Sequence, residues 1–536
     1  NSRAIAIDTN ADVDNLTITG NTFMSNSRVF GSIAPAGIDF DDADDTLDAT
    51  GNYWGDPSGP TVASNPGGAG DAIFGNVLYD PWPDKPTRVP VILVPGILGT
   101  KLYDGDEEVW VNYFDLVTDA GDDFMNVLAM NFDGSSAGNI TTGDIVRDAP
   151  FTDVFNGLID ELGDAGYTEN TDLFVAPYDW RLDIRESSQT LAAKIEEVLA
   201  QTNNEQVNIV AHSMGGLVTK QYILDNGASD INKIIFVGTP HLGAPKAAKA
   251  LLFGDDMNVF RLSPERVQYI GQYMLSIYEL LPTPSYFDQT GYYYYDSVVG
   301  VIYDYEDTTQ FLTDSGLSPL LLTEAEEFHS SALDDFDTSG LDVYNINGCN
   351  KPTITRIVKL SDEEYVIDML AGDETIPIES SDALAIDASR IFYFNDIKHA
   401  TMPSADGIRD LIAQIVTESE ISLPNNATQD SSQCNIAGQL VSVHSPVNLH
   451  IYDLEGNHVG RGENGDIEYE ISGVAYEEIG ENKFVFLPES GGLSYQIELD
   501  GTDEGTFSLR VSKVENNEVT ETVYYNDLPV SSTTEA

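Results

Sequence analysis

The sequence predicts an α/β domain between two β-rich segments, with a mostly parallel sheet covered by helices on both faces. An apolar run over 206–210 is followed by the small residues of a tight turn and then by helical spacing over 216–224. The segment 13–23 instead alternates apolar and polar residues before Asn and Gly. Short alternating strands separated by Gly, Asn and Asp turns fill 435–536. We therefore expect the α/β domain over 89–423, with β structure on both sides.

The first 80 residues have the pattern of a parallel β-helix. Val13–Phe23 reads as one strand-and-turn rung, and Ala49–Pro60 resembles a string that recurs at the last coils of right-handed β-helix proteins. One or two rungs cannot bury a core alone. We therefore expect 1–80 to be the terminal rungs of a longer β-helix, and the chain to be a fragment or a processed product. The proline-rich stretch that follows predicts a stiff linker over 81–88.

The most informative stretch is Val210–Leu217, Val-Ala-His-Ser-Met-Gly-Gly-Leu, which joins the predicted strand to the predicted helix. It has the pattern of a nucleophile elbow, a sharp turn with Ser213 at its apex. This turn crowds the neighbouring strand and helix, so small residues are needed two positions either side, where Ala211 and Gly215 stand. The motif predicts an α/β-hydrolase fold with Ser213 as nucleophile. The alternative is a serine that caps a helix after a core strand.

A serine needs a base to take its proton, and the chain has seven histidines. The hydrolase fold places its residues in the chain order Ser, acid, His. Asp373 follows a predicted strand in a Gly-Asp turn, and His399 comes after it, whereas His329 precedes it and would break the order. His212 lies beside Ser213 in the elbow, where we expect its side chain to point away from Oγ. Asp373 could also be a solvated turn carboxylate, since this chain has many.

Two backbone N–H groups are expected to bind the oxyanion of a tetrahedral intermediate. One belongs to the residue after the nucleophile, Met214. The other comes from the loop after an early strand, which 88–100 supplies together with a Pro95-Gly96 turn. Ile97 is therefore the second predicted donor, although an ordinary strand-ending turn would have the same sequence pattern.

Five strings together resemble the lecithin:cholesterol acyltransferase family, an α/β-hydrolase group that includes phospholipid:diacylglycerol acyltransferases and A-type phospholipases. They are Val-Pro-Gly-Ile-Leu-Gly-Thr from Val94, Ala-Pro-Tyr-Asp-Trp-Arg-Leu from Ala176, Ala-His-Ser-Met-Gly-Gly from Ala211, Gly-Thr-Pro-His-Leu-Gly-Ala-Pro from Gly238 and Gly-Asp-Glu-Thr-Ile-Pro from Gly372. The resemblance runs from about Val89 to Ala413. The Tyr-Asp-Trp-Arg string together with Gly-Thr-Pro-His is its most specific part.

This resemblance implies a catalytic triad and an oxyanion hole. The implied triad is Ser213, Asp373 and His399, and the implied oxyanion donors are the amides of Ile97 and Met214. One departure is Glu374, which stands where the family usually has Gly after the acid.

Two segments of the α/β domain are expected to shape a substrate pocket. A lid is predicted near 103–150, where the family has a segment that covers the site and meets the lipid surface. A cap is predicted near 254–300, although its run of four tyrosines could instead pair across a sheet. Trp110 and Trp180 are the candidate substrate-binding residues, with ordinary core packing as the alternative for both.

The far end of the chain predicts an accessory domain. The polar segment 424–434 reads as a linker, and 435–536 reads as a β-sandwich without catalytic motifs. Cys349 and Cys434 are the only cysteines, so they form either one disulfide that ties the two domains or two free buried thiols. They have no Cys-x-x-Cys spacing and no nearby histidine cluster, and we predict no bound metal there.

The charge is strongly acidic, with 89 Asp and Glu against 25 Lys and Arg and a formal net charge of −64. Such a surface excludes nucleic acid as a partner, because phosphates require Lys and Arg. It should also repel anionic membranes unless salt or divalent cations screen it. The acidic stretch Asp39–Asp48 leaves Ca²⁺ open as a ligand, although it lacks the spacing of an EF-hand. No apolar run is long enough to span a membrane.

Taken together, the residues and the resemblance predict a secreted or cell-surface serine enzyme that needs no cofactor. It would be a lipid acyl hydrolase or acyltransferase acting on a phospholipid or neutral lipid ester, its partner being the lipid or ester substrate at a lipid surface. One alternative is a soluble carboxylesterase or triacylglycerol lipase. Another is a surface adhesin or scaffold that carries a degenerate hydrolase module.

Overall fold

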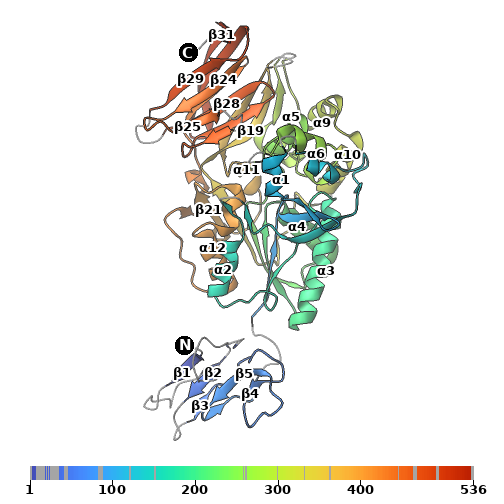
Figure 1. The fold of residues 1–536 in the computed structure, drawn as a ribbon, viewed down its shortest axis with the longest axis vertical. Coiled ribbons are helices and arrows are strands. Elements are labelled where there is room, and N and C mark those ends of the chain that lie inside the picture. The colour runs from blue at the N-terminus through green and yellow to red at the C-terminus, as the bar shows by residue number, and fades with distance from the viewer. Residues whose placement is uncertain are drawn as a thin grey trace. The chain divides into compact units, whose positions relative to one another are not determined.

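Figure 1 shows the fold of the chain in a computed structural model. It describes residues 3–7, 18–19, 21, 23, 36–40, 46–82, 88–119, 122–149, 152–257, 259, 262–297, 300–330, 332–360, 364–444, 446–462, 467–489 and 494–532. The chain divides into two compact units. One comprises Asn1–Val91, Tyr167–Phe174 and Ile195–Asn208, and the other comprises Ile92–Gly166, Val175–Lys194 and Ile209–Ala536.

The N-terminal segment is built from short parallel strands. They are β1 (Arg3–Ile7), β2 (Ala36–Phe40), β5 (Gly70–Phe74) and β4 (Pro60–Thr61), in the order β1-β2-β5-β4, and the pair β3 (Leu47–Asp48) and β6 (Val77–Leu78). Trp54 is fully buried and stacks on Phe23 with 4.7 Å between ring centroids. The Asn52 amide donates hydrogen bonds to the backbone oxygens of Ile18 and Ala49. Most of 13–23, where a rung is predicted, lies outside the described residues.

The central sheet confirms the predicted α/β core. Its strands, in the order β13-β7-β14-β15-β18-β21-β22, are β13 (Leu173–Val175), β7 (Val91–Val94), β14 (Val207–His212), β15 (Ile231–Val237), β18 (Val343–Cys349), β21 (Ile391–Asn395) and β22 (Ala427–Thr428). Strands β15, β18 and β21 are parallel, and β22 is antiparallel to β21. Every residue of β7 and β14 is buried, as expected where helices cover both faces of a sheet.

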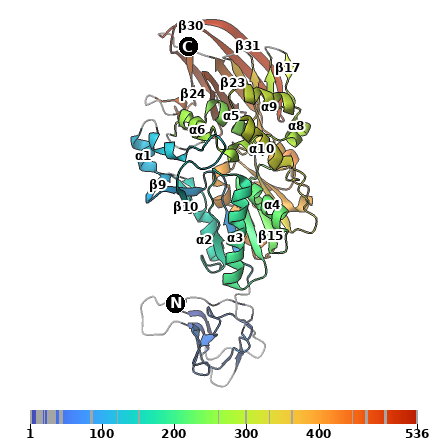
Figure 2. The same cartoon turned by 90° about the vertical axis from the view of Figure 1, so that its right-hand side faces the viewer.

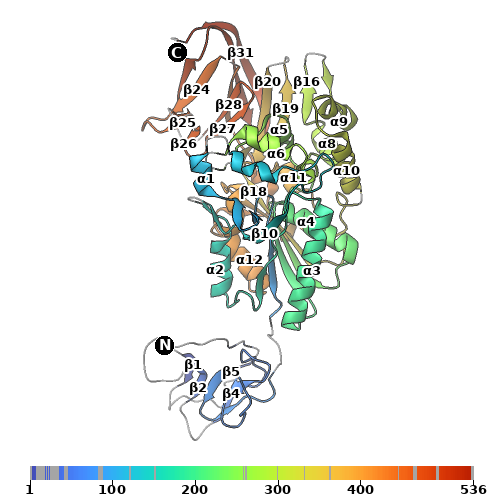
Figure 3. The same ribbon diagram turned by 45° about the vertical axis from the view of Figure 1, so that its right-hand side comes forward.

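Helices lie on both faces of this sheet (Figures 1 and 3). The main helices are α2 (Asn156–Asp164), α3 (Ile184–Thr202), α4 (Met214–Asn226) and α12 (Ile408–Val416). Helices α2 and α12 cover one face, and α3 and α4 cover the other (Figure 3). This arrangement places the sharp turn between β14 and α4 at one end of a rigid sheet.

A hairpin leaves the central sheet after β18 and returns at the predicted acid. It consists of β19 (Lys351–Lys359) and β20 (Tyr365–Gly372), which join β16 (Tyr294–Asp296) and β17 (Val301–Ile302) in the order β17-β16-β19-β20. Tyr294 and Tyr295 pair with Ile357 and Val358 of β19. For these two tyrosines the strand alternative is therefore correct, because their backbone extends a sheet.

The predicted lid and cap are both structured and lie at the same end of the sheet (Figures 2 and 3). The lid contains β8 (Thr100–Asp104), β9 (Glu107–Trp110), α1 (Tyr113–Thr118), η1 (Asp123–Leu128), β10 (Ile140–Ile145) and β11 (Asp148–Ala149), and β12 (Thr152–Asp153) pairs with β11. The predicted cap over 254–300 contains α6 (Pro264–Gly271), α7 (Leu275–Tyr278) and α8 (Pro284–Thr290). Helix α5 (Pro245–Phe253) precedes it, and α9 (Tyr305–Asp314) and α10 (Pro319–Ser330) follow it.

Residues 435–536 form two antiparallel sheets over one core. The larger sheet has the order β27 (Ala475–Ile479), β28 (Asn482–Pro488), β23 (Gly438–His444), β30 (Gly505–Glu515) and β31 (Glu518–Val530). The smaller has the order β26 (Ile467–Tyr469), β25 (His458–Arg461), β24 (Val447–Tyr452) and β29 (Gln496–Gly501). Both sheets contribute to one buried cluster, including Val441 and Val485 from the larger and Leu449 and Val459 from the smaller. We call this part the C-terminal domain.

The segment 424–434 is more than the linker that its polar sequence suggests. Its residues Ala427 and Thr428 form β22, which pairs with Tyr393 and Phe394 at the edge of the central sheet. This edge strand has only two residues, so hydrophobic patterning did not reveal it. Cys434 ends this segment and forms a disulfide with Cys349, the last residue of β18, so the two thiols are not free.

Candidate active site

Ser213 occupies the sharp turn between β14 and α4. Its backbone has φ 55° and ψ −129°, a conformation that is strained for a residue with a side chain. A Cβ on Gly215 would lie 2.5 Å from the backbone oxygen of Pro95, so the turn has no room for one there. A Cβ on Gly96 would likewise lie 2.6 Å from the Cβ of Ser213. The packing therefore explains why small residues surround the serine.

Ser213, His399 and Asp373 form one chain of hydrogen bonds. His399 Nδ1 lies 2.7 Å from Asp373 Oδ2, and His399 Nε2 lies 2.9 Å from Ser213 Oγ. A carboxylate only accepts, so Nδ1 carries the proton in the neutral ring and Nε2 is left to accept from the serine hydroxyl. The structure thus brings together the three residues that the sequence selected.

Asp373 is almost fully buried, and both of its carboxylate oxygens are used. Oδ1 accepts hydrogen bonds from the backbone N–H groups of Thr375 at 3.0 Å and Ile376 at 2.7 Å, which leaves Oδ2 for His399. The Asp373 carbonyl also accepts from the backbone N–H of His399 at 2.9 Å. The acid is therefore fixed in one rotamer and holds the histidine by side chain and backbone.

His212 holds His399 from a second side, which sequence reasoning missed. Its Nε2 lies 3.0 Å from the backbone oxygen of His399, and it donates this bond because a carbonyl only accepts. Burial, followed by the nearby His399, lowers the pKa of His212 to about 3, so the ring is neutral. The only sequence signal was its place beside Ser213 in the elbow.

Glu374 keeps the turn after the acid in the shape that glycine favours. Its φ is 80°, in the left-handed region, and its backbone N–H donates to Thr353 Oγ1 at 3.0 Å. Its carboxylate lies 3.6 Å from the ammonium of Lys398, and both side chains border the pocket. The departure from the family pattern therefore changes the side chain of this turn without opening the turn.

The two candidate oxyanion donors flank the serine. Met214 begins α4 with a buried side chain, and Ile97 lies in the pocket wall together with Ser213. The loop that carries Ile97 is held from both ends. Tyr178 Oη donates to the backbone oxygen of Pro95 at 2.7 Å, and Trp110 Nε1 donates to that of Leu98 at 2.7 Å.

The hydrogen-bonded Ser213–His399 pair opens into a pocket of about 360 Å³. Most of its lining is apolar and comes from the oxyanion loop, the lid, the cap and the turns that carry the acid and the histidine. Trp110 and Trp180 both border it and meet edge to face, with 5.7 Å between centroids. Trp180 Nε1 also donates to the backbone oxygen of Thr100 at 3.0 Å. This hydrogen bond fixes the orientation of the ring that borders the pocket.

Arg181, in the Tyr-Asp-Trp-Arg string, tethers the lid. It is fully buried, with Nε 2.9 Å and Nη2 2.6 Å from the two carboxylate oxygens of Asp179. Its Nη1 donates to the backbone oxygen of Leu128 at the end of η1. His329 lies elsewhere and bonds Asp334 at 2.7 Å, in agreement with its exclusion from the site.

The described residues hold neither a metal-binding cluster nor a membrane-spanning helix. Within these, no group of three or more His, Cys, Asp or Glu side chains is placed to hold a metal ion. The acidic stretch Asp39–Asp48 was the candidate for Ca²⁺ binding. It lies partly outside the described residues, because 41–45 are not described. In the described part of the chain, no helix combines the length and apolar character needed to cross a membrane.

The central sheet, the elbow and the Ser213–His399–Asp373 arrangement define the class of α/β-hydrolases with serine-hydrolase geometry. Residues 147–371 match the family model described as lecithin:cholesterol acyltransferase. Over these residues, less than half of its length, the chain is similar to the lecithin:cholesterol acyltransferase family.

Curated relatives show the same similarity. Phosphatidylcholine-sterol acyltransferase of Mus musculus is 24% identical over 360 residues, which cover 57% of this chain and 80% of the mouse protein. An uncharacterized protein of Saccharomyces cerevisiae is 34% identical over 197 residues, covering 35% of this chain and 28% of the yeast protein. Lysosomal phospholipase A and acyltransferase of Canis lupus familiaris is 31% identical over 134 residues, which cover 24% of this chain and 33% of the dog protein. The matches therefore span most of the mouse relative but only a third or less of the other two.

Proposed function

We propose that this chain is a serine-dependent lipid acyl hydrolase or acyltransferase that works through an acyl-enzyme at Ser213. The observation that carries the proposal is the hydrogen-bonded chain from Ser213 through His399 to Asp373 beside a large apolar pocket. An apolar pocket suits an acyl chain, because burial of hydrocarbon is favourable by about 25 cal/mol per Å². The names of the mouse and dog relatives support acyl transfer from a phospholipid.

The first half of the reaction forms the acyl-enzyme. His399 Nε2 takes the proton from Ser213 Oγ, and Oγ adds to the carbonyl carbon of the ester. The negative charge on the former carbonyl oxygen is bound by the backbone N–H groups of Ile97 and Met214. The carbon–oxygen bond to the leaving group then breaks, and His399 gives its proton to the departing oxygen. Asp373 keeps His399 in the required tautomer and stabilises its protonated form.

The second half of the reaction decides between hydrolysis and transfer. Water or a lipid alcohol gives its proton to His399 and adds to the acyl carbon, and Ser213 leaves with the returned proton. Both acceptors use the same three residues, so the lining of the pocket has to select between them. Trp110 and Trp180 border the space where the acyl group would lie, and we assign them a substrate-binding role.

The first experiment is labelling of Ser213 with a fluorophosphonate, with Ser213→Ala as the control. Labelling of the native chain alone supports an activated serine. An unlabelled native chain would instead favour the scaffold alternative, in which the hydrolase module is inactive.

The second experiment is mass spectrometry of products from phosphatidylcholine vesicles, with and without an added sterol or diacylglycerol. Release of fatty acid alone identifies a hydrolase. A new sterol ester or triacylglycerol identifies an acyltransferase. Activity on short soluble esters without either product would favour the carboxylesterase alternative.

The flanking parts have proposed roles of their own. We infer that the N-terminal segment consists of parallel β-helix rungs, on the basis of its parallel strands and the long-range hydrogen bond from the Asn52 amide to the backbone oxygen of Ile18. We assign the two-sheet C-terminal domain as a β-sandwich accessory domain. The disulfide between Cys349 and Cys434 supports a secreted or cell-surface location, because such bonds persist in oxidising compartments.

A further inference from the structure

Four charged side chains are buried together where α5 and the turn after it meet the C-terminal domain. We call them the lysine cluster, and they are Lys246, Lys249, Asp255 and Glu477. The side chains of both lysines are 6% exposed, that of Asp255 is 0% exposed and that of Glu477 is 14% exposed. The cluster holds two positive and two negative charges, and Asp256 next to it adds a weaker negative charge that acts on Lys246.

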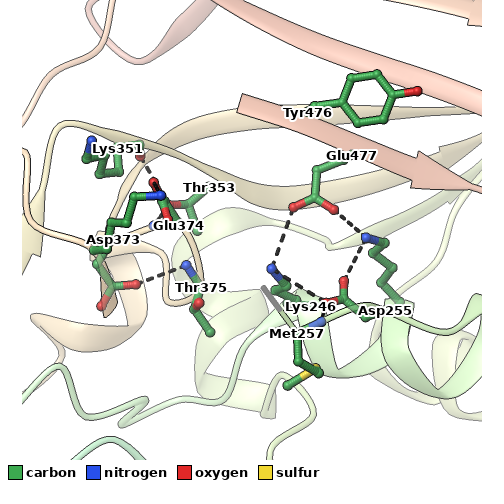
Figure 4. A network of polar contacts seen from close by, with 12 residues as sticks. Lys246, Asp255, Met257, Lys351, Thr353, Asp373, Glu374, Thr375, Tyr476 and Glu477 are labelled. Carbon is green, nitrogen blue, oxygen red and sulfur yellow. Dashed lines mark hydrogen bonds and ion pairs between the residues drawn. The ribbon is translucent and has the colours of Figure 1, made fainter. Parts of the chain in front are cut away.

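The C-terminal domain supplies one of these charges. Glu477 projects from β27 toward Lys246 and Asp255, while the neighbouring Tyr476 lies on the opposite side of the strand (Figure 4). The Glu477 carboxylate contacts the ammonium of Lys249 and lies 3.6 Å from that of Lys246. Lys249 lies 2.7 Å and Lys246 3.7 Å from the carboxylate of Asp255. Without Glu477, Asp255 would be the one carboxylate in ion-pair contact with both buried ammonium groups, and Asp256 would act only on Lys246 and more weakly.

The lysine cluster also forms the back of the proposed acyl pocket. Lys246, Ala247 and Ala250 of α5 line that pocket, and so does Met257. Asp255 Oδ1 accepts from the backbone N–H of Met257 at 2.7 Å. The ammonium of Lys246 points toward the carboxylates of Asp255 and Glu477 (Figure 4). Lys246 also lines the pocket, so its hydrocarbon stem can serve as part of the apolar surface.

The ionisation of the cluster agrees with this geometry. Burial would lower the pKa of Lys249, but Asp255 and Glu477 outweigh burial and raise it. Burial would raise the pKa of Asp255, but the two lysines hold it below its ordinary value. The lysines and Asp255 are therefore charged at neutral pH, and each carboxylate is needed as a counter-charge.

We propose that Glu477 of the C-terminal domain is a positioning residue for the acyl pocket, because it withdraws the Lys246 ammonium from the wall and fixes Met257 through Asp255. This inference rests on the proposed lipid acyl activity. It makes the C-terminal domain part of the machinery that selects long acyl chains. Loss of the Glu477 charge leaves a net positive charge behind the wall, which draws solvent and mobile ammonium groups toward the hydrocarbon-binding surface.

The test measures kcat and KM of the full chain for p-nitrophenyl esters from acetate to palmitate. Glu477→Gln should lower kcat/KM for the palmitate ester at least about tenfold, mainly through KM, and change the acetate value less than about twofold. Glu478→Gln is the matched control, because Glu478 is the next residue of β27 and pairs with Arg461 inside the C-terminal domain. This control should leave both esters within about twofold of the native chain.

A charge-balanced variant separates positioning from folding. Lys249→Met combined with Glu477→Gln leaves Lys246 paired with Asp255 and removes the excess charge, and Lys249 does not line the pocket. It should recover palmitate activity to within about threefold of the native chain, even if Glu477→Gln alone fails to fold.

Three outcomes would overturn this inference. Glu477→Gln could behave like Glu478→Gln, it could lower acetate and palmitate activity equally, or the charge-balanced variant could fail to recover palmitate activity. Failure of the proposed function would look different. In that case the native chain would cleave no long-chain ester, whatever stands at position 477.

Discussion

Replacement of Asp373 by Asn is the sharpest test of the hydrogen-bonded chain at the site. The two oxygens of Asp373 have different partners, since Oδ1 accepts from the backbone N–H groups of Thr375 and Ile376 and Oδ2 accepts from His399. An asparagine must turn its oxygen toward the two backbone donors, because its NH₂ group would be repelled by them. Its NH₂ group then faces His399 Nδ1.

This contact changes the tautomer of His399. Two donors cannot face each other, so Nδ1 loses its proton and Nε2 gains one. A protonated Nε2 cannot take the proton of Ser213. The same wrong-tautomer effect in a serine protease triad costs a factor of about 10⁴ in kcat, which corresponds to about 5 kcal/mol. KM should change less than about threefold, because Asp373 is not among the pocket-lining residues.

The assay is steady-state hydrolysis of a p-nitrophenyl ester, combined with thermal unfolding of each variant. Asp382→Asn is the matched control, because this carboxylate also accepts a hydrogen bond, from the Tyr393 hydroxyl at 2.8 Å, and lies outside the pocket. The control should keep kcat within about twofold of the native chain. If Asp373→Asn kept more than about a tenth of the native kcat while remaining folded, the tautomer argument would be refuted.

Three further predictions concern stability and the acid turn. The disulfide joins two residues with a sequence separation of 85. Replacing both Cys349 and Cys434 by Ser should therefore lower the free energy of unfolding by up to about 4.5 kcal/mol. An unchanged midpoint of urea unfolding would contradict this prediction. Burial lowers the pKa of His212 to about 3, so between pH 6.5 and 3 the unfolded chain binds a proton that the folded chain does not. The free energy of unfolding therefore falls as pH falls through this window, and it is about 2 kcal/mol lower at pH 5. Urea unfolding at pH 8 and pH 5 measures this difference. His212→Gln should remove the contribution of about 2 kcal/mol from it. Glu374→Gly removes the cost of a positive φ, about 1–3 kcal/mol, and adds about 0.4–1 kcal/mol of entropy to the unfolded chain, so the free energy of unfolding should rise by up to about 2 kcal/mol. The value of kcat should change less than about threefold, and a larger loss would give Glu374 a part in the reaction.

The core of the site could be predicted because its signals are local. Strand, turn and helix around Ser213 follow one another within a few residues, and each has its own pattern of apolar and small side chains. The chain order of the fold then selected Asp373 and His399 from many acids and seven histidines. The hairpin of β19 and β20 between β18 and the acid did not disturb this reasoning, because the hairpin returns to the end of the strand that it left.

The remaining features depend on contacts between distant parts of the chain. Lys249 and Glu477 are 228 residues apart, and nothing in either segment signals the other. The hydrogen bond between His212 and His399 joins residues that are 187 positions apart. It can be predicted only once the position of the turn after β21 is known. The edge strand β22 has only two residues and no apolar alternation. Such features follow from packing and become visible only in three dimensions.

The acid turn shows how a departure from a family pattern can leave the geometry intact. Glycine at position 374 would adopt a positive φ freely, whereas glutamate does so at a cost of about 1–3 kcal/mol. Three hydrogen bonds in the turn offset this cost. Asp373 Oδ1 accepts two of them from backbone N–H groups, and Thr353 Oγ1 accepts the third from the backbone N–H of Glu374. These bonds fix the turn whatever side chain stands at 374. The glutamate is therefore no sign of a degenerate hydrolase, and the scaffold alternative loses the one residue that favoured it within the hydrolase itself.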